Sequence, residues 1–151
     1  MVKNNTNPIE IFPMTNTDLI YFEKELTTQF DVFWTFSILK QEFENENTIY
    51  IVAKQDTEIV GFAGILPIID EANIMNIVTK KDKRNLGIGS KLLQKLIDIS
   101  KEKKLKSITL EVNENNISAI KLYTKFKFET VGTRKKYYNN TDSAILMTLY
   151  I

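Results

Sequence analysis

The sequence Arg84-Asn85-Leu86-Gly87-Ile88-Gly89 begins the stretch that decides the fold, because it places an R-x-x-G-x-G loop directly before a predicted helix. An apolar stripe at helical spacing predicts that helix over residues 88–102. A strand is predicted over residues 107–112, and a short helix that ends at about Lys125 follows it. The order of loop, helix, strand and helix is typical of a layered α/β sheet.

The remaining predicted elements fit the same fold class. Pro67 is expected to end the strand that begins at Ile59, and Gly61 and Gly64 within that strand indicate a bend or a close approach of other backbone. The sequence contains no linker, repeat or low-complexity segment, so a single domain over residues 1–151 is expected. Strands are expected at residues 9–13, 48–54, 59–66, 72–78, 128–134 and 144–150, and helices from a cap within residues 15–18 to about residue 30 and at residues 34–43.

The composition limits the chemistry that the chain can perform. Its 151 residues are about one domain's worth, with 43% apolar and 26% charged residues and a formal net charge of +1. The absence of cysteine and histidine excludes disulfides, thiolate nucleophiles, Ser-His triads and His/Cys zinc sites, so no metal is expected. Acid-base chemistry must then use Asp, Glu, Lys or Tyr. The small net charge argues against an extended nucleic-acid footprint.

No segment of the sequence indicates export or insertion into a membrane. The first residues carry no apolar run of the signal-peptide type, and no apolar stretch approaches the ~20 residues that a spanning helix needs. We therefore expect a soluble cytoplasmic protein without a membrane partner.

The glycine loop has the features of an anion-binding site. Amides at a helix N-terminus lack intrahelical partners and lie at the positive end of the helix dipole. Gly87 and Gly89 remove the Cβ atoms that would keep a phosphate away from the backbone. The pattern is neither the Rossmann fingerprint nor the P-loop, and the alternative is a plain glycine turn among solvated lysines. The basic residues that add positive potential around the loop are Lys80, Lys81, Lys83 and Arg84.

Glu111 is the candidate base, because it lies at the C-terminal end of a predicted strand, where open α/β sheets build their sites. By alternation it faces with Thr109 and opposite Leu110 and Val112. The apolar neighbours are expected to desolvate the carboxylate in part, which would strengthen it as a base. The alternative is an ordinary strand-end glutamate that faces water.

Asn116 and Tyr123 are about two helical turns apart, so they share one face of the last predicted helix, which an asparagine at 115 or 116 caps. A phenol has an unperturbed pKa of ~10, so Tyr123 is protonated at neutral pH and can act as an acid towards a leaving group such as a thiolate. The alternative for Tyr123 is a core aromatic residue whose hydroxyl is satisfied elsewhere.

These residues together resemble the GCN5-related N-acetyltransferases (GNAT), and most closely the branch that acetylates the N-terminal alanine of ribosomal proteins. The resemblance is strong over roughly the second half of the chain, and the first half matches in layout and at Phe33-Trp34. The matching segments are Asn76-Ile77-Val78, Arg84 to Gly89, Leu110-Glu111-Val112, Asn116, Ala119-Ile120, Leu122-Tyr123, Arg134, Tyr137-Tyr138 and Ala144 to Met147.

The resemblance implies a GNAT fold, with a mixed, mostly antiparallel sheet that is splayed at the cofactor site and flanked by helices. It implies that acetyl-CoA is the donor and that transfer to an amine is direct, with Glu111 as general base, alone or through water, and Tyr123 as general acid. The residues that it implies for acetyl-CoA binding are Ile77, Val78, Thr79, Arg84, Asn85, Leu86, Gly87, Ile88, Gly89, Ser90 and Asn116.

The sequence departs from the family pattern in three places. Lys127 stands before Phe128 where the family has glycine, so the turn there is expected to differ, because a left-handed lysine is strained. Asn139-Asn140 replaces a proline-containing entry to the last loop, which is shorter here and borders the acceptor site in the family. Lys80-Lys81 replaces an Asp-Pro pair.

The leading interpretation is an N-acetyltransferase that modifies the α-amine of a protein N-terminus, with the N-terminal alanine of a small-subunit ribosomal protein as acceptor. A second interpretation is acetylation of a small amine such as a polyamine, an amino acid or an aminoglycoside, because the Asn139 loop differs. A third is a non-catalytic RNA- or ribosome-binding module, for which the lysines of residues 101–106 are the motive, although such runs are usually solvated helix ends.

Overall fold

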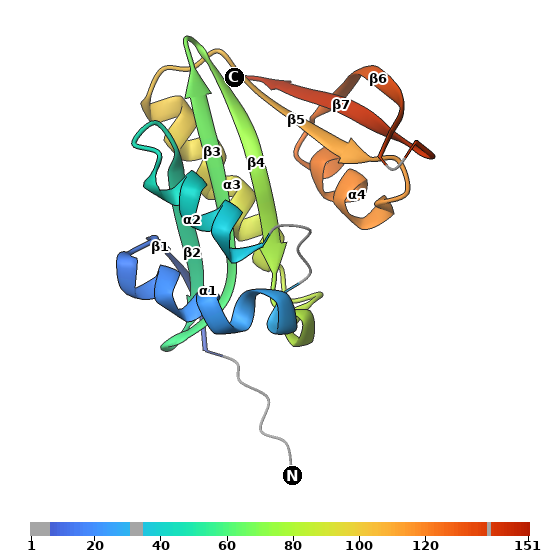
Figure 1. Cartoon of the computed structure of the whole chain (residues 1–151). Helices are drawn as coiled ribbons and strands as arrows, with labels where there is room; N and C mark the ends of the chain where they lie inside the picture. Colours follow the sequence, from blue (N-terminus) through green and yellow to red (C-terminus); the bar gives the residue numbers. More distant parts are fainter. Residues whose placement is uncertain (1–6, 31–34, 139) are drawn as a thin grey trace. The chain divides into compact units, whose positions relative to one another are not determined.

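A computed structural model of the chain describes residues 7–30, 35–138 and 140–151 (Figure 1). Its strands are β1 (Ile9–Pro13), β2 (Ile49–Gln55), β3 (Glu58–Ile68), β4 (Glu71–Thr79), β5 (Ser107–Asn113), β6 (Glu129–Tyr138) and β7 (Asp142–Tyr150). Its helices are α1 (Asn16–Gln29), α2 (Phe36–Glu44), α3 (Ile88–Glu102) and α4 (Ile117–Lys125), with a short 3-10 turn η1 (Lys81–Lys83).

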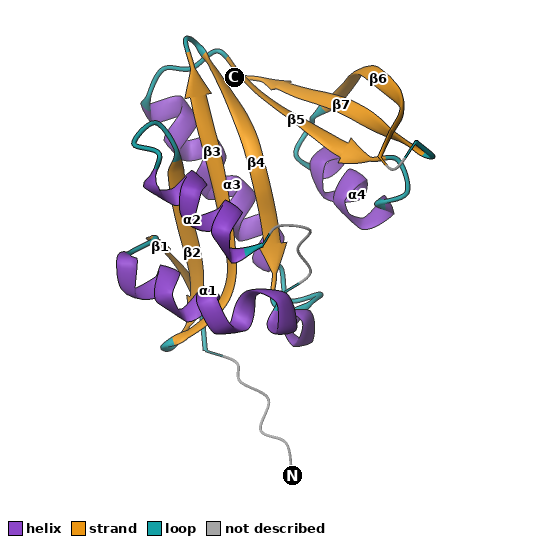
Figure 2. Cartoon of the chain, in the orientation of Figure 1, coloured by secondary structure: helices purple, strands orange, loops and turns teal. Residues whose placement is uncertain are grey.

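The strands of the described residues hydrogen-bond in the order β1-β2-β3-β4-β5-β7-β6 (Figure 2). β1 with β2, β5 with β7 and β6 with β7 are antiparallel, whereas β4 and β5 are parallel. This topology confirms the predicted mixed, mostly antiparallel sheet. No helix among the described residues is long and apolar enough to cross a membrane.

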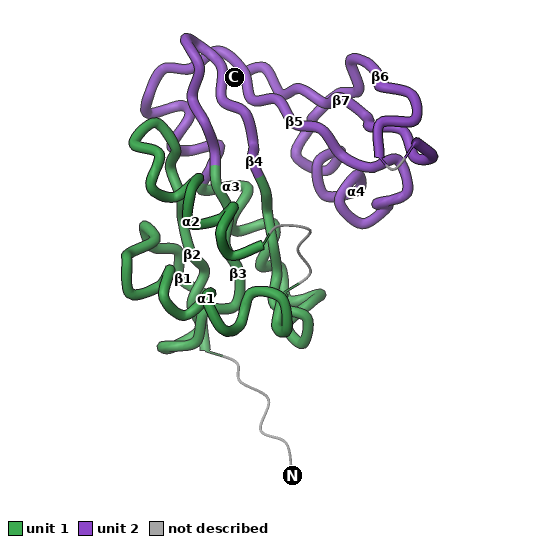
Figure 3. Tube along the Cα trace, viewed as in Figure 1, with its two compact units in different colours: residues 1–64, 76–95 green, residues 65–75, 96–151 purple. Residues whose placement is uncertain are grey.

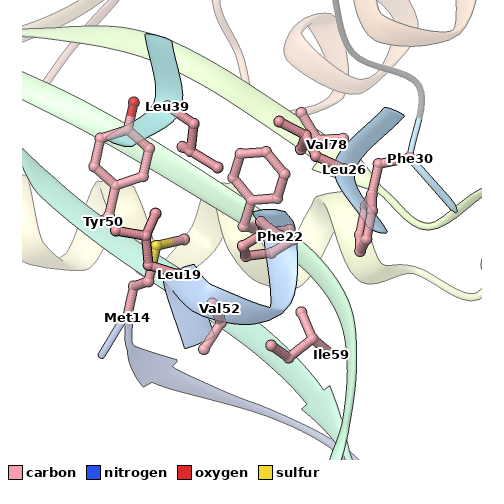
Figure 4. Close-up of a cluster of buried hydrophobic side chains, with 11 residues drawn as sticks. Met14, Leu19, Phe22, Leu26, Phe30, Leu39, Tyr50, Val52, Ile59 and Val78 are labelled. Atoms are coloured by element: carbon pink, nitrogen blue, oxygen red, sulfur yellow. The ribbon is translucent and has the colours of Figure 1, made fainter. Parts of the chain in front are cut away.

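The chain forms two compact units (Figure 3). One consists of residues 1–64 and 76–95, and the other of residues 65–75 and 96–151. The first unit is built around the cluster of buried side chains in Figure 4, in which Phe22 and Leu26 of α1 are almost fully buried. The ring of Phe22 lies with its centroid 5.2 Å from that of Phe30 and 4.8 Å from that of Phe62.

Helix α1 begins at its predicted cap, whereas α2 begins later than predicted. Thr15 caps α1, and its hydroxyl accepts from the Asp18 amide at 3.2 Å while the Asp18 carboxylate accepts from the Thr15 amide at 2.9 Å. Helix α2 begins at Phe36 rather than at Trp34, which lies outside the described residues together with Phe33. Leu39 of α2 is fully buried, and Phe36 and Phe43 pack against the same cluster, so these three residues form the apolar face of the helix.

The two glycines of β3 lie where other groups approach the strand closely, as predicted. A Cβ at Gly64 would lie 2.4 Å from Cζ of Tyr50, and a Cβ at Gly61 would lie 2.8 Å from Cγ2 of Ile88 and 2.9 Å from the carbonyl oxygen of Val78. Real Cβ atoms do not come this close to other atoms. Gly61 therefore allows the first turn of α3 to pack directly on the sheet.

Two predicted strand ends are wrong. β3 does not end before Pro67 but continues to Ile68. Its eleven residues extend beyond the seven of β2, and where a strand lacks one neighbour the missing N–H of a proline breaks no hydrogen bond of the sheet. β6 continues to Tyr138 instead of ending at Arg134, because a shift in its register on β7 absorbs extra residues that simple alternation does not reveal.

Candidate active site

The parallel ladder between β4 and β5 is short. It pairs Glu71–Asn73 with Ser107–Thr109, although β4 continues to Thr79 and β5 to Asn113. The part of β4 that contains the predicted residues Ile77, Val78 and Thr79 is therefore not used by this ladder. The Val78 side chain is 7% exposed and belongs to the core of the first unit, so a ligand can meet Val78 only through its backbone.

The predicted glycine loop leads into α3 through two left-handed residues, Asn85 with φ 63° and Gly87 with φ 76°. The first amide to bond within the helix is that of Lys91, which donates to the Gly87 carbonyl at 3.1 Å. The amides of Ile88, Gly89 and Ser90 thus precede the first intrahelical donor and are directed out of the helix end. A Cβ at Gly87 would meet open space, so the glycine is required here by its positive φ.

The basic side chains near the loop do not all serve it. The Lys80 ammonium is 3.0 Å from one carboxylate oxygen of Glu58, and that of Lys83 is 3.6 Å from the other. Burial alone would lower the pKa of Lys80, but the hydrogen bond and charge of Glu58 outweigh it and raise the pKa. Lys80 and Lys83 therefore remain cations, as predicted, but the Glu58 carboxylate that they share offsets part of their positive potential.

Glu111 lies in β5 and is paired with Leu146 of β7. Its side chain is about one-third exposed, and its Oε1 is 3.1 Å from Nη2 of Arg134. Leu110 and Val112, which were expected to cover the carboxylate in part, point to the opposite, buried face of the strand and do not cover it. The carboxylate instead has a cationic partner.

Tyr123 of α4 is buried, with 8% of its surface exposed, and its ring centroid is 5.7 Å from that of Phe128. Burial raises the pKa of Tyr123 to about 12. The residue is therefore a packed aromatic, as the alternative interpretation held, and also a phenol that stays protonated at neutral pH.

The end of α4 fixes this aromatic pair. The Lys127 amide donates to the Thr124 carbonyl and the Phe128 amide to the Tyr123 carbonyl, both at 3.0 Å. These are the two hydrogen bonds of a Schellman cap, whose characteristic apolar contact joins Tyr123 and Phe128. Lys127 has φ 74°, so the expectation that the turn would differ is wrong: the turn forms, with a strained lysine in the glycine position.

Asn116 is the N-cap of α4, and its Oδ1 accepts from the Ala119 amide at 3.3 Å. Because the side-chain oxygen is used in the cap, a contact with a ligand would come from the side-chain nitrogen. Asn139 of the last predicted loop lies outside the described residues. In the described part of the chain, no group of acidic side chains is placed to hold a metal ion.

Sequence reasoning assigned no role to three residues that gather at Glu111. Besides Arg134, these are Tyr137, whose ring lies 5.5 Å from the Arg134 guanidinium, and Tyr138. Burial, and after it the charge of Glu111, raises the pKa of Tyr138, which places this phenol near the carboxylate. The signal in the sequence was that Arg134 and Tyr137-Tyr138 belong to the segments that resemble the family, whereas the register shift that brings them together is not visible in the sequence.

The sheet order β1-β2-β3-β4-β5-β7-β6, with its parallel β4–β5 ladder, matches the fold of solved N-acetyltransferases. The model of the acetyltransferase (GNAT) family matches residues 14–128, and the chain belongs to this family.

Similar proteins carry more specific descriptions. The ribosomal protein bS18-alanine N-acetyltransferase of Haemophilus influenzae is 35% identical over 122 residues, which cover 78% of this chain and 82% of the relative. The crystal structure of the ribosomal-protein-S18-alanine N-acetyltransferase from Escherichia coli superposes with a TM-score of 0.84 at 27% identity, over 95% of this chain and 94% of that one. A Bacillus anthracis acetyltransferase in complex with acetyl coenzyme A superposes at 28% identity with a TM-score of 0.67, over 74% of this chain and 67% of that one.

Proposed function

We propose that this protein transfers the acetyl group of acetyl-CoA to the N-terminal α-amine of a protein, and that the acceptor is the N-terminal alanine of ribosomal protein bS18. The observation that carries the acceptor is the similarity, over most of the chain, to enzymes described by that reaction. The alternative acceptor is a small amine.

We assign the binding of the donor, acetyl-CoA, to the glycine loop and to the end of β4. The amides of Ile88, Gly89 and Ser90 suit the pyrophosphate of acetyl-CoA, because they precede the first intrahelical donor and lie at the positive end of the α3 dipole. The backbone of Ile77 and Val78 suits the pantetheine arm, since this part of β4 is outside the ladder with β5.

Glu111 and Tyr123 act on different groups of the reaction: Glu111 on the acceptor amine and Tyr123 on the leaving thiolate. Glu111 takes a proton from the acceptor ammonium, directly or through water, and the neutral amine then attacks the thioester carbonyl. As the new C–N bond forms and the C–S bond breaks, the nitrogen releases its second proton to solvent. Because burial raises the pKa of Tyr123 to about 12, whereas a thiol has a pKa of ~8.5, the phenol favours donating a hydrogen bond to the leaving thiolate over complete proton transfer. The thiolate then takes its proton from solvent.

An intact-mass assay tests the proposal. The protein is incubated with acetyl-CoA and a peptide that copies the N-terminus of bS18, and the matched control is the same peptide with its α-amine already blocked. We expect one acetyl group on the free peptide and none on the blocked one. If polyamines, amino acids or aminoglycosides are acetylated and the peptide is not, the proposed acceptor is wrong, but the proposed acetyl transfer to an amine stands.

Variants test the two roles. Glu111→Gln should lower kcat by roughly 10²–10⁴-fold, as expected for loss of a general base, whereas Glu129→Gln, an exposed glutamate of β6, should not. Tyr123→Phe should lower kcat with little change in the dissociation constant of acetyl-CoA measured by calorimetry. An unchanged rate in either variant contradicts its role.

A further inference from the structure

Arg134 makes two kinds of contact with its guanidinium group, and both are in the second compact unit. Its Nη2 lies 3.1 Å from Oε1 of Glu111, and its central carbon lies 5.5 Å from the ring centroid of Tyr137. The Tyr137 ring in turn meets that of Tyr138 edge-on, with the centroids 5.1 Å apart. The arginine is therefore held by an aromatic ring while it binds the carboxylate.

The strand register explains how Arg134 reaches Glu111. Leu146 of β7 is paired with Glu111 on one side and with Gly132 of β6 on the other, so these residues form one row across the sheet. Arg134 lies two residues further along β6, on the same face as Gly132. Gly132 has no side chain, so Leu146 is the only other residue of this row whose side chain lies beside Glu111. The long side chain of Arg134 can therefore extend diagonally over β7 to the Glu111 carboxylate.

A bulge in β6 brings Tyr137 to the same place. Arg134 is paired with Ala144 and Tyr138 with Asp142, so four steps along β6 match two steps along β7. Lys136 within the bulge has φ 52°, and its amide donates to the Ser143 hydroxyl at 3.3 Å. In a regular strand residues 134 and 137 would face opposite sides, and the bulge is what brings the Tyr137 ring to the Arg134 guanidinium.

We propose that Arg134 is a positioning residue for the reaction: held by Tyr137, it keeps the Glu111 carboxylate in one orientation and acts on the acceptor only through it. This inference rests on the proposed function, because it assumes that Glu111 is the base. The physical reason is that a carboxylate one-third exposed to solvent otherwise samples several rotamers, and a base must lie within hydrogen-bond reach of the proton that it takes.

A double-mutant cycle on kcat tests the proposal. Arg134→Met should lower kcat by roughly ten- to a hundredfold, in line with the loss from a misplaced catalytic group, and should leave the KM for acetyl-CoA unchanged. In the Glu111→Gln background the same change should have no further effect, because there is no base left to position. Arg134→Lys, which keeps the charge but not the planar group, should recover part of the rate.

Two controls separate positioning from charge and from folding. Lys135→Met removes a cation from the adjacent exposed position of β6 and should leave kcat unchanged. Tyr137→Leu, which keeps an apolar side chain but loses the ring, should give a smaller loss of kcat than Arg134→Met, also only when Glu111 is present.

The outcomes distinguish this inference from the proposed function. If the losses from Glu111→Gln and Arg134→Met multiply, Arg134 acts independently of Glu111 and the inference is overturned while acetyl transfer stands. If Arg134→Met raises a KM and leaves kcat unchanged, Arg134 binds a substrate instead. If the wild-type protein acetylates no amine at all, the proposed function fails, and the inference fails with it.

Discussion

Several residues other than glycine have a left-handed backbone conformation, which is strained for most side chains. Among the described residues other than glycine, a positive φ occurs at Asp56, Ile69, Asn85, Lys104, Lys127, Lys136 and Asn140. Asparagine and aspartate tolerate this conformation, whereas a β-branched side chain does not. Ile69, in the turn between β3 and β4, has φ 58° and is 96% exposed, so no packing offsets its strain.

Replacing Ile69 with glycine should therefore stabilise the protein by about 1 kcal/mol, since the relief of strain exceeds the added entropy of the unfolded chain. For a chain of this size that corresponds to a rise in Tm of roughly 2–4 °C, which calorimetry resolves. The matched control is Ile68→Gly at the end of β3, where φ is not positive and glycine should not stabilise. Equal shifts in both variants would rule out strain as the cause.

Tyr123 should give the folded protein a dependence on alkaline pH. Burial raises its pKa to about 12, against ~10 in an unfolded chain, so between these values the folded state binds the proton more tightly. Its contribution to stability is complete below pH ~10 and is lost as the pH rises towards 12, by about 1.4 kcal/mol per pH unit. Urea unfolding at pH 9, 10 and 11 should show a steeper decline for wild type than for Tyr123→Phe, with Tyr150→Phe, which removes an exposed phenol, as the control.

At the scale of elements, the position of α3 depends on a glycine in another element. A Cβ at Gly61 would lie 2.8 Å from a methyl carbon of Ile88 and 2.9 Å from the Val78 carbonyl oxygen, and backbone cannot move as a side-chain end can. The first turn of α3, where the amides proposed for the pyrophosphate lie, is thus held against β3 and β4.

Gly61→Ala should consequently cost about 1–3 kcal/mol of stability through overpacking and should also weaken acetyl-CoA binding. Calorimetric titration with acetyl-CoA and urea unfolding measure the two effects. Gly132→Ala is the control. Its Cβ would lie 3.2 Å from the flexible end of the Leu146 side chain, and residue 132 is far from α3 in the sequence. Unchanged acetyl-CoA affinity in a folded Gly61→Ala protein would show that α3 tolerates the displacement.

The cap of α4 offers a stabilising change next to a candidate catalytic residue. Lys127 has the left-handed conformation that a Schellman motif normally gives to glycine, and its side chain is exposed. Lys127→Gly should raise the free energy of unfolding by about 1 kcal/mol and leave kcat unchanged, since the hydrogen bonds to Thr124 and Tyr123 are made by backbone amides. Lys125→Gly, inside the helix, should be destabilising by a similar amount.

At the scale of the whole molecule, the sequence predicts the elements and their order well because apolar periodicity determines both. The stripe from Ile88 to Ile99 predicts α3 with its observed ends, and alternation places Leu110 and Val112 on the buried face. Periodicity fails where the backbone departs from regular geometry. The left-handed Lys136 bulge and the continuation of β3 through Pro67 depend on neighbouring strands that no local pattern reveals.

The sequence identifies candidate residues for the site, but it does not predict which side chains surround them. Residue identity and spacing, together with the family resemblance, were enough to propose Glu111, Tyr123 and the glycine loop as candidates, since these are local features. The partner of Glu111 was not predictable, because Arg134 reaches it across β7 through pairings far apart in the sequence. For the same reason Lys80, adjacent to the loop in sequence, has Glu58 as its partner.

The early end of the ladder between β4 and β5 affects how readily the protein aggregates or is degraded in a cell. Unpaired strand backbone is a template for adding a foreign strand, and proteins normally cover or shorten such edges. A donor whose pantetheine arm carries peptide-like amide groups, bound along residues 77–78, would act as a removable substitute for the missing strand. We therefore expect depletion of acetyl-CoA to speed aggregation and proteolysis of this enzyme, and a light-scattering assay with and without the donor would detect it. Donor supply would then govern how much enzyme survives as well as how fast it works.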